Sequence, residues 1–449
     1  MKNYLYKLLT KYLSLYILPQ NSVLEIDPST TSLISAFPQG KITLRESRNG
    51  ASQNTLNKED LKKISEKRID FSEIKSLNPN YIILCGLLHY ENDIQELFSK
   101  LHQVSNDSTR LILLYYSNLW RPFIAFASMI GIRSKNKEQN WLAHEDIANL
   151  LALEKFELIS LNQKILIPIY IPFLSNFVNR YIAPLPFIKN FCLVNIAVAK
   201  RIKDHKSSSS QSVSIVVPAR NEAGNIKEII NRIPKMGPED EIIFIEGNST
   251  DDTWSVIKKI KEEYGDTRNI VIAQQEGKGK GDAVRLGFSL ATKDIFMILD
   301  ADMTVPPEDL PKFYREIVFG SADFVNGNRL VYPMEKGAMR FFNLIGNKFF
   351  ALSFSFVLSQ RFKDTLCGTK VITSENYKTL AKNRSFFGNF DPFGDFDLIF
   401  GASRMGLKII EVPITYRERT YGDTNISRWR HGTILLAMLI YAARKIKFI

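Results

Sequence analysis

Residues 294–302 have the sequence Asp294-Ile295-Phe296-Met297-Ile298-Leu299-Asp300-Ala301-Asp302, an apolar segment that ends in two carboxylates. Five of the six residues from Ile295 to Asp300 are apolar, and they favour β-structure, so they predict a strand that is buried on both faces of a parallel sheet. Pro306 and Pro307 follow and prevent the strand from continuing. This segment therefore predicts an α/β domain with two acids at the end of a strand.

Asp300 and Asp302 lie where open α/β sheets bind their ligands, at the carboxyl end of a strand. Two carboxylates at such a position can hold a divalent cation, Mg²⁺ or Mn²⁺, that bridges a diphosphate. The alternative is a strand that ends in a solvated Asp-rich turn. The motif alone favours the solvated turn, and the neighbouring segments reverse this in favour of the cation.

The size and composition of the chain indicate two domains and an acidic partner. At 449 residues the chain exceeds one ordinary hydrophobic core. Its formal net charge of +12 suggests a nucleotide or anionic lipid, while the absence of a long basic block with interleaved aromatics argues against nucleic acid. The three cysteines are far apart and fit a reducing, cytoplasmic location. No apolar segment reaches the roughly 18–20 residues of a membrane span, so we expect a soluble or membrane-peripheral protein.

The first part of the chain predicts an α/β domain with a mainly parallel sheet. Short apolar β-forming segments alternate with helical patterns; the strands are expected at 21–27, 81–84 and 110–116 and the helices at 92–104 and 144–153. Residues 164–199 are apolar, aromatic and interrupted by prolines, and are interpreted as an arm that packs on a domain or dips into a membrane face. The Ser-rich segment 203–211 is a linker. The predicted domains are therefore 1–202 and 212–449.

Three segments between about residues 15 and 200 resemble class I S-adenosylmethionine-dependent methyltransferases: 23–30, 81–88 and 141–146. The resemblance implies a Rossmann-like methyltransferase fold for this domain. That family has a glycine-rich turn after its first strand, which lets the backbone approach the cofactor. This chain has Asp27-Pro28-Ser29-Thr30-Thr31 instead. We expect a methyltransferase-like domain that binds no cofactor; an active methyltransferase is the alternative.

The second domain carries three further segments suited to a nucleotide diphosphate. Val213–Val217 predicts a buried strand that leads into Pro218, Ala219 and Glu222, and Glu241–Ile245 predicts a strand that ends at Glu246. Glu222 can face a nucleotide, or it can be a first-turn acid favoured by the helix dipole. Glu246 can accept hydrogen bonds from a nucleobase or ribose, or the segment after it can serve only as a capping turn. The Gly/Lys turn 277–281, which contains Lys280, opens a helix and suits a diphosphate.

Together with Asp300, Ala301 and Asp302, these segments resemble the inverting glycosyltransferases of family 2, which have the GT-A fold. The resemblance covers about residues 212–430 and is strongest to polyprenyl-phosphate sugar synthases of the dolichol-phosphate mannosyltransferase type. It implies that Asp300 and Asp302 bind Mg²⁺ or Mn²⁺ on a nucleotide-diphosphate sugar. It also implies that the nucleotide-sugar pocket is lined by Pro218, Ala219, Glu222, Glu246, Lys280, Asp300, Ala301 and Asp302. Where the family often has two adjacent aspartates, this chain has Glu246-Gly247.

The resemblance continues through the acceptor half. It implies that Gly327-Asn328-Arg329 forms a strand after the metal motif and that 364–370 borders the donor sugar. Asp395 and Asp397, at a predicted helix start, are the catalytic candidates, and Asp397 is preferred; a helix N-terminal acid without a catalytic role is the alternative. Residues 416–425 resemble the family's Arg-x-x-Gly-x-Ser-Lys loop, with Asn425 in place of lysine.

Clustered arginines suit a phosphate acceptor, because a guanidinium group binds phosphate oxygens through two hydrogen bonds. Arg417, Arg419 and Arg428 are therefore acceptor-phosphate candidates, and Arg430 can supply a further cation; a solvated basic face is the alternative. The apolar helix predicted at 433–443, with basic residues on both sides, can rest on anionic headgroups or pack on its domain.

The sequence thus predicts a metal-dependent glycosyltransferase that acts on a nucleotide-diphosphate sugar and a polyprenyl phosphate at the cytoplasmic membrane face. Two other classes stay open: a methyltransferase whose active domain is the first, and a non-catalytic scaffold that binds nucleotide sugars. The oligomeric state is not predicted.

Overall fold

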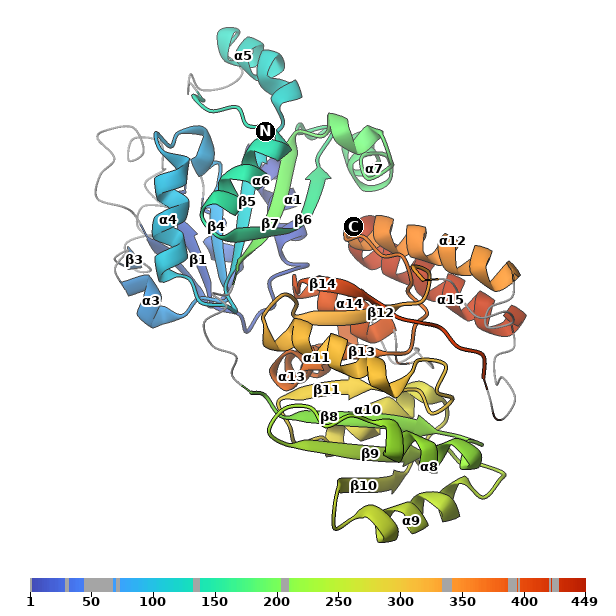
Figure 1. Ribbon diagram of the computed structural model, residues 1–449. Helices are drawn as coiled ribbons and strands as arrows, with labels where there is room; N and C mark the ends of the chain where they lie inside the picture. Colours follow the sequence, from blue (N-terminus) through green and yellow to red (C-terminus); the bar gives the residue numbers. More distant parts are fainter. Residues whose placement is uncertain are drawn as a thin grey trace. The chain divides into compact units, whose positions relative to one another are not determined.

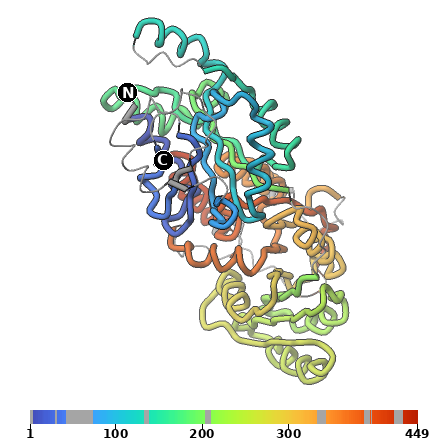
Figure 2. The backbone as a smooth tube through the Cα atoms, turned by 90° about the vertical axis from the view of Figure 1, so that its left-hand side faces the viewer, coloured from blue at the N-terminus to red at the C-terminus, as the bar shows by residue number. Residues whose placement is uncertain are grey.

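The computed structural model describes residues 2–28, 32–43, 68–69, 73–131, 138–202, 210–332, 341–386, 394, 396–419, 421 and 428–449. These residues form two compact units. Unit 1 comprises residues 1–202 together with 445–449, and unit 2 comprises residues 203–444. The last five residues, which the sequence analysis assigned to the second domain, therefore belong to unit 1, as do the first residues of the chain (Figure 2).

Within its described residues, unit 1 holds a seven-stranded sheet in the order β3-β2-β1-β4-β5-β7-β6. Strands β1 to β5 are parallel, and β7 runs antiparallel to β5 and β6. The strands are β1 (Val23–Ile26), β2 (Gly40–Thr43), β3 (Arg68–Ile69), β4 (Tyr81–Cys85), β5 (Arg110–Tyr116), β6 (Phe156–Lys164) and β7 (Val194–Arg201). The helices are α1 (Lys2–Leu13), α3 (Ile74–Leu77), α4 (Ile94–Val104), α5 (Arg121–Met129), α6 (His144–Leu153) and α7 (Leu174–Phe177) (Figure 1).

Both faces of the unit 1 sheet are covered, as the apolar strands require. Along β4, Ile83 and Cys85 belong to one buried cluster with Leu9 and Leu13 of α1. Ile82 and Leu84 belong to the other cluster, with side chains of α4 and α6. Alternate strand residues point to opposite faces, so a strand that is apolar at every position has to be covered on both sides. The predicted α/β domain with a mainly parallel sheet is present.

Unit 2 has a seven-stranded mixed sheet among its described residues, in the order β10-β9-β8-β11-β13-β12-β14. The strands are β8 (Val213–Ala219), β9 (Asp240–Glu246), β10 (Asn269–Gln274), β11 (Ile295–Ile298), β12 (Phe324–Asn328), β13 (Lys370–Thr373) and β14 (Ile409–Pro413). The helices are α8 (Ala223–Arg232), α9 (Thr253–Tyr264), α10 (Lys280–Leu290), α11 (Leu310–Val318), α12 (Phe341–Leu358), α13 (Ser374–Lys382), α14 (Phe396–Arg404) and α15 (Arg428–Ala442) (Figure 1).

The predicted strand at 295–300 is β11, but its environment is only partly the one predicted. It is parallel to β8 on one side and antiparallel to β13 on the other. The prediction of a purely parallel sheet was wrong at this point, because an apolar strand of this kind fits any fully covered sheet and does not encode the direction of its neighbour. All four residues of β11 are buried.

Helix α10 packs tightly against the centre of this sheet. It contacts β8 and β9, and Gly287 lies so close to Val216 that a Cβ atom at Gly287 would overlap the valine side chain. The turn before the helix includes Gly279, whose φ of +88° is a conformation that favours glycine. This packing brings the first residue of α10, Lys280, to the carboxyl ends of the strands.

Candidate active site

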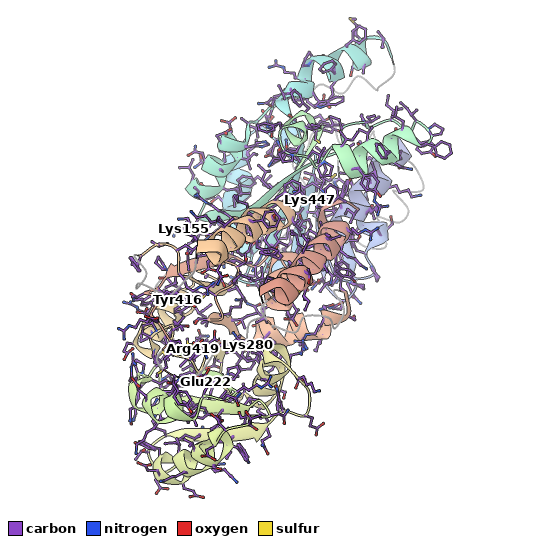
Figure 3. The ribbon with its side chains drawn as sticks, turned by 90° about the vertical axis from the view of Figure 1, so that its right-hand side faces the viewer. Lys155, Glu222, Lys280, Tyr416, Arg419 and Lys447 are labelled. Carbon is purple, nitrogen blue, oxygen red and sulfur yellow. The ribbon has the colours of Figure 1, made fainter. Side chains whose placement is uncertain are left out.

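The site lies at the edge of the unit 2 sheet where β8, β9, β11, β12 and β14 have their carboxyl ends. These strands share one direction, since β8 is parallel to β9 and β11, while β12 and β14 are each related to β11 through the antiparallel β13. The segments that follow them therefore come together at one edge. Figure 3 labels four side chains that gather in this region of unit 2: Glu222, Lys280, Tyr416 and Arg419.

Asp300 forms an ion pair with Lys280, and the Lys280 ammonium nitrogen lies 2.6 Å from Asp300 Oδ1. Burial raises the pKa of Asp300, but the positive charge and hydrogen bond of Lys280, with the charges of Lys370 and Arg329, outweigh it and lower the pKa below its ordinary value. Gly368 lies directly against the pair, because a Cβ atom there would overlap both Asp300 and Lys280. The residue type at 368 is thus set by the space that the ion pair occupies.

Asp302 and Glu222 share one guanidinium group. Arg419 donates from Nη2 to Asp302 Oδ2 at 2.7 Å and from Nη1 to Glu222 Oε1 at 2.9 Å. The other Asp302 oxygen accepts from the backbone N–H of Thr304 at 3.1 Å and from its hydroxyl at 2.9 Å. Glu222 Oε2 accepts from Asn225 at 2.7 Å. Both carboxylates are therefore held in fixed orientations.

The pKa of Glu222 is raised to about 7, and burial is the largest cause. The positive charge of Arg419 opposes the shift, while the negative charge of Asp302 adds to it. A carboxylic acid with this pKa changes its charge near neutral pH, and such groups cluster at functional sites. Glu222 is thus a group that titrates near neutral pH while it is hydrogen-bonded to Arg419.

Glu246 is buried at the end of β9 and is hydrogen-bonded to the loop that follows this strand. Its carboxylate accepts from the backbone N–H of Ser249 at 2.5 Å and from the Gln274 side chain at 2.8 Å. Ala219, at the end of β8, is also buried, and its carbonyl accepts from the N–H of Gly247 at 2.8 Å. Pro218 is half-buried on the same strand. These residues shape the strand ends next to Glu222.

Asp397 lies in the first turn of α14 and is ion-paired with two arginines. Arg384 donates to Asp397 Oδ2 at 2.9 Å, and Arg285 of α10 lies 3.7 Å from the same oxygen. Gly394 lies against Gly281, since a Cβ atom added at position 394 would overlap the Gly281 backbone. The start of α14 therefore lies beside the start of α10. Asp395 is outside the described residues.

Arg329 and Asp364 form a buried ion pair to which the sequence analysis gave no specific role. The guanidinium donates to both carboxylate oxygens, at 2.7 and 2.8 Å, and Asn347 donates to Asp364 at 2.9 Å. Burial opposes ionisation, but Arg329 outweighs it and lowers the pKa of Asp364 to about 2. Arg329 also lies over the ring of Tyr416, 5.0 Å from its centroid. This pair fixes the segment before β13 to the end of β12.

Arg285, Arg329 and Arg384 were not predicted as site residues. Arg285 and Arg384 are single cations outside a motif, and Arg329 was expected only as part of a strand. The available signal was positional for Arg329, which directly follows a strand that ends at the same edge as Asp300. Arg285 and Arg384 gave no such signal, because they are brought to Asp397 only by the packing of α10 and by the segment after α13.

The segment after β14 contains the arginines predicted to contact an acceptor phosphate. The structure brings one of them, Arg419, to the carboxylates of Asp302 and Glu222. The Arg417 backbone N–H donates to Thr304 at 2.9 Å, and its side chain is exposed. Arg428 begins α15, but its side chain and that of Arg430 lie outside the described residues, as does Asn425. Tyr421 packs on Gly224 at the start of α8, beside Glu222.

A divalent cation fits the chemistry of Asp300 and Asp302. In the part of the chain that the structure describes, no group of three or more acidic, histidine or cysteine side chains forms a ready-made metal cage. Mg²⁺ is commonly held by one or two carboxylates and completed by substrate phosphates and water, so a pair of aspartates suffices. In this structure the two carboxylates contact the cationic groups of Lys280 and Arg419. A metal–diphosphate complex would have to exchange with those contacts.

In unit 1, the turn after β1 begins with a non-glycine residue in the left-handed region. Asp27 has a φ of +42° and is buried, and Pro28 follows it. The neighbouring Glu25 is also buried; it accepts from the Ser32 hydroxyl at 2.6 Å and from the Leu33 N–H at 2.9 Å. The chain therefore ties its own loop to the strand end, while residues 29–31 lie outside the described part.

In the described residues, no helix combines the length and the apolar character needed to cross a bilayer.

Comparison with known proteins agrees with the predicted family 2 glycosyltransferase. Residues 214–380 match the family model described as glycosyl transferase family 2. Glycosyltransferase AglJ of Haloferax volcanii is 30% identical over 235 residues, which cover 52% of this chain and 72% of that protein. The dolichol-phosphate mannosyltransferase of Pyrococcus furiosus is 28% identical over 48% of this chain, and the match spans 59% of that protein. A glucosyl-3-phosphoglycerate synthase of Mycobacterium tuberculosis, solved with Mn²⁺ and UDP, superposes with a TM-score of 0.39 and 19% identity over 55% of this chain and 83% of its own.

An undecaprenyl-phosphate 4-deoxy-4-formamido-L-arabinose transferase of Enterobacter is 24% identical over 50% of this chain and 65% of its own length. The chain thus covers between half and three quarters of the length of the relatives named here. The family match falls within unit 2 and includes the strand ends that carry Glu222, Glu246, Asp300 and Asp302. On the strength of this match and of the AglJ relative, the chain belongs to glycosyl transferase family 2.

Proposed function

We propose that unit 2 transfers a sugar from a nucleotide-diphosphate sugar to the phosphate of a polyprenyl phosphate at a membrane face. The observation that carries the proposal is the group of alternating charges at one sheet edge: Lys280 with Asp300, and Arg419 with Asp302 and Glu222. A diphosphate with its metal ion carries the same two kinds of charge, so it can exchange with the internal ion pairs without leaving any of these groups unpaired.

On the donor side, the nucleotide would lie across the ends of β8 and β9, beside Pro218, Ala219, Glu222 and Glu246. The diphosphate would accept hydrogen bonds at the start of α10, where the backbone N–H groups and the Lys280 ammonium favour negative charge. Asp300 and Asp302 would hold Mg²⁺ or Mn²⁺, whose charge would stabilise the leaving diphosphate. Ala301 sets these two aspartates one residue apart.

On the acceptor side, two of the relatives are a dolichol-phosphate mannosyltransferase and an undecaprenyl-phosphate 4-deoxy-4-formamido-L-arabinose transferase. A phosphate monoester oxygen is already anionic near neutral pH, so it can attack the sugar carbon without a strong base. We propose that Asp397 acts mainly by orienting Arg384 and Arg285 toward the acceptor phosphate, with Asp395 nearby in sequence. Arg417, Arg419 and Arg428 are the other phosphate candidates, and the family resemblance implies inversion at the sugar carbon.

The experiment that tests the proposal is incubation of the full-length protein with Mn²⁺ or Mg²⁺, a panel of nucleotide sugars and a polyprenyl phosphate. We expect metal-dependent release of nucleotide and formation of a lipid-linked sugar with one donor of the panel. Undiminished transfer in excess chelator would remove the metal from the proposal. Equally fast transfer to a soluble sugar, with all lipid absent, would remove the polyprenyl phosphate.

A substitution of Arg419 can distinguish a role in acceptor binding from a role in donor binding. Arg419→Ala is expected to raise the KM for the acceptor far more than the KM for the donor, if the guanidinium leaves Asp302 and Glu222 when the donor and metal bind. A change in donor KM alone would mean that Arg419 stays with the donor carboxylates and does not contact the acceptor.

For unit 1, we propose a methyltransferase-like fold that does not bind S-adenosylmethionine. Its strand order is the dinucleotide-binding order 3-2-1-4-5-6 with β7 inserted beside β5. In the turn after β1, Asp27 and Pro28 supply side chains where a cofactor-binding turn needs glycine. Isothermal titration with S-adenosylmethionine should show no heat at millimolar concentrations, and micromolar binding would contradict the proposal.

A further inference from the structure

A segment of unit 1 exposes large apolar side chains in an unusual way. Residues 169–191, which we call the aromatic arm, include α7 and lie between β6 and β7. Its exposed large apolar residues are Ile169, Tyr170, Ile171, Phe173, Leu174, Phe177, Tyr181, Leu185, Phe187 and Phe191. A soluble surface rarely gathers so many without a binding partner.

Two tight turns hold the most exposed of these side chains. Phe173 is 92% exposed and Phe187 is 83% exposed. Both are non-glycine residues with positive φ, at +61° and +66°. In each turn the N–H of the next residue donates to the carbonyl of the preceding proline, from Leu174 to Pro172 at 2.7 Å and from Ile188 to Pro186 at 2.9 Å.

This pattern is a γ-turn with the rare, strained sign of φ, and it occurs twice in the same sequence context of apolar residue, proline, phenylalanine and apolar residue. Such backbone strain persists only where the surrounding structure maintains it, and strained residues concentrate at functional sites. Both turns place a bare phenylalanine ring in solvent.

The interior of the arm is polar while its exterior is apolar. The buried Ser175 hydroxyl donates to the Ile169 carbonyl at 2.6 Å and accepts from the Ile171 N–H at 2.8 Å. The buried Asn179 side chain accepts from the N–H groups of Leu166 and Ile167, at 2.8 and 2.9 Å. These backbone polar groups are thus satisfied internally, as is required where a segment faces an apolar medium.

The charge of the arm complements an acidic surface. The sequence has no Asp or Glu between Glu157 and Asp204, whereas Arg180 and Lys189 lie within the arm. Helix α5 extends the apolar surface, since Phe123, Phe126 and Met129 are exposed and the Trp120 ring N–H just before it donates to the Phe191 carbonyl at 2.8 Å. No acid occurs between Asp107 and Glu138 either.

We propose that the aromatic arm and α5 form a surface that inserts into the interface of an anionic lipid bilayer, with Phe173 and Phe187 as its deepest side chains. Apolar rings beside cations, in a segment whose sequence contains no acid, match acyl chains beneath acidic headgroups. This inference rests on the proposed function. It adds that the membrane contact of an enzyme with a lipid acceptor is made by unit 1.

The test is flotation of the full-length protein with vesicles of phosphatidylcholine and phosphatidylglycerol, without donor or acceptor. The wild type should float with these vesicles and bind pure phosphatidylcholine vesicles less well. The double variant Phe173→Ser/Phe187→Ser should bind about tenfold less tightly, since two large apolar side chains no longer enter the bilayer. The matched control is Leu153→Ser/Phe319→Ser, which removes two exposed apolar side chains outside the surface and should bind like the wild type.

The proposal would be overturned if the wild type did not bind anionic vesicles, or if both double variants bound them equally well. It would also be overturned if the wild type were a dimer that the arm variant converts to a monomer with no change in vesicle binding. Because Phe173 and Phe187 are exposed, an unchanged thermal midpoint should show that the variant is folded. A water-soluble short prenyl phosphate separates this proposal from the proposed function. The arm variant should use it as well as the wild type does and lose efficiency only with vesicle-embedded acceptor, whereas failure of the wild type with every acceptor would refute the function and leave the flotation result standing.

Discussion

Lys280 and Asp300 join the first turn of α10 to the end of β11 through a 2.6 Å ion pair. A cation and an anion are thereby kept at the same point of the sheet edge. If the donor binds as proposed, the ammonium turns to the diphosphate and the carboxylate turns to the metal ion, so both groups keep a partner of opposite charge. This exchange would avoid the cost of desolvating an unpaired charge.

Gly368→Ala should abolish donor binding while leaving the fold intact. The new Cβ atom would overlap Asp300 and Lys280, so the ion pair would be displaced, and with it one of the two carboxylates proposed to hold the metal ion. Titration with the nucleotide sugar and Mn²⁺ measures the effect. Gly346→Ala is the control, because nothing lies within 4 Å of the corresponding Cβ position. Equal donor affinity in both variants would refute the placement of the donor beside Asp300.

Asp302→Asn should reduce transfer by about a hundredfold or more, since a metal ion supplies several kcal/mol of charge stabilisation to the leaving group. Folding should be kept, because the residue lies at the edge of the sheet and is not fully buried. Initial rates at saturating metal ion, with a melting curve for each protein, measure both effects. The exposed Asp266→Asn is the control for the charge change. Wild-type turnover in Asp302→Asn would contradict the metal role.

Glu222→Gln should change how stability depends on pH. The pKa of Glu222 is raised from 4.5 to about 7 in the folded protein, so between these values the folded protein holds a proton that the unfolded chain has released. The free energy of unfolding of the wild type therefore decreases as pH rises through this window. The variant lacks this loss and should be more stable than the wild type at pH 8, by on the order of 2 kcal/mol.

Urea unfolding of both proteins at pH 5 and pH 8 measures the Glu222 effect. The difference between wild type and variant should be largest at pH 8 and small at pH 5. A difference of the same size at both pH values would mean that the carboxyl does not titrate in this window.

Asp364→Asn should destabilise unit 2 by about 3–5 kcal/mol, because it leaves the buried Arg329 without its counter-charge. The pKa of Asp364 is lowered from 3.8 to about 2. Its stabilisation is therefore complete above pH 3.8 and is lost as pH falls through about 2. Urea unfolding near neutral pH, with Asp266→Asn as control, measures the loss. A change below 1 kcal/mol would show that this ion pair contributes little to the fold.

The sequence by itself determined the local elements and the residue types at the strand ends. The helix predicted at 144–153 is α6, and the strand predicted at 110–116 is β5, with the same bounds. The acids after β11 and the Gly/Lys turn before α10 were also evident, because apolar periodicity, proline and glycine act over only a few residues. The family match at 214–380 covers both of these segments.

Only the tertiary structure decided which distant groups meet. Arg419 reaches Asp302 and Glu222, which lie 117 and 197 residues earlier in the chain. The antiparallel pairing of β11 with β13 is equally absent from the sequence pattern. The exposure of Phe173 and Phe187 could not be predicted either, because an apolar segment has the same sequence pattern whether it is buried in a core or exposed. Such pairings depend on chain topology and on which side of a turn is covered, and neither is encoded in a short window of residues.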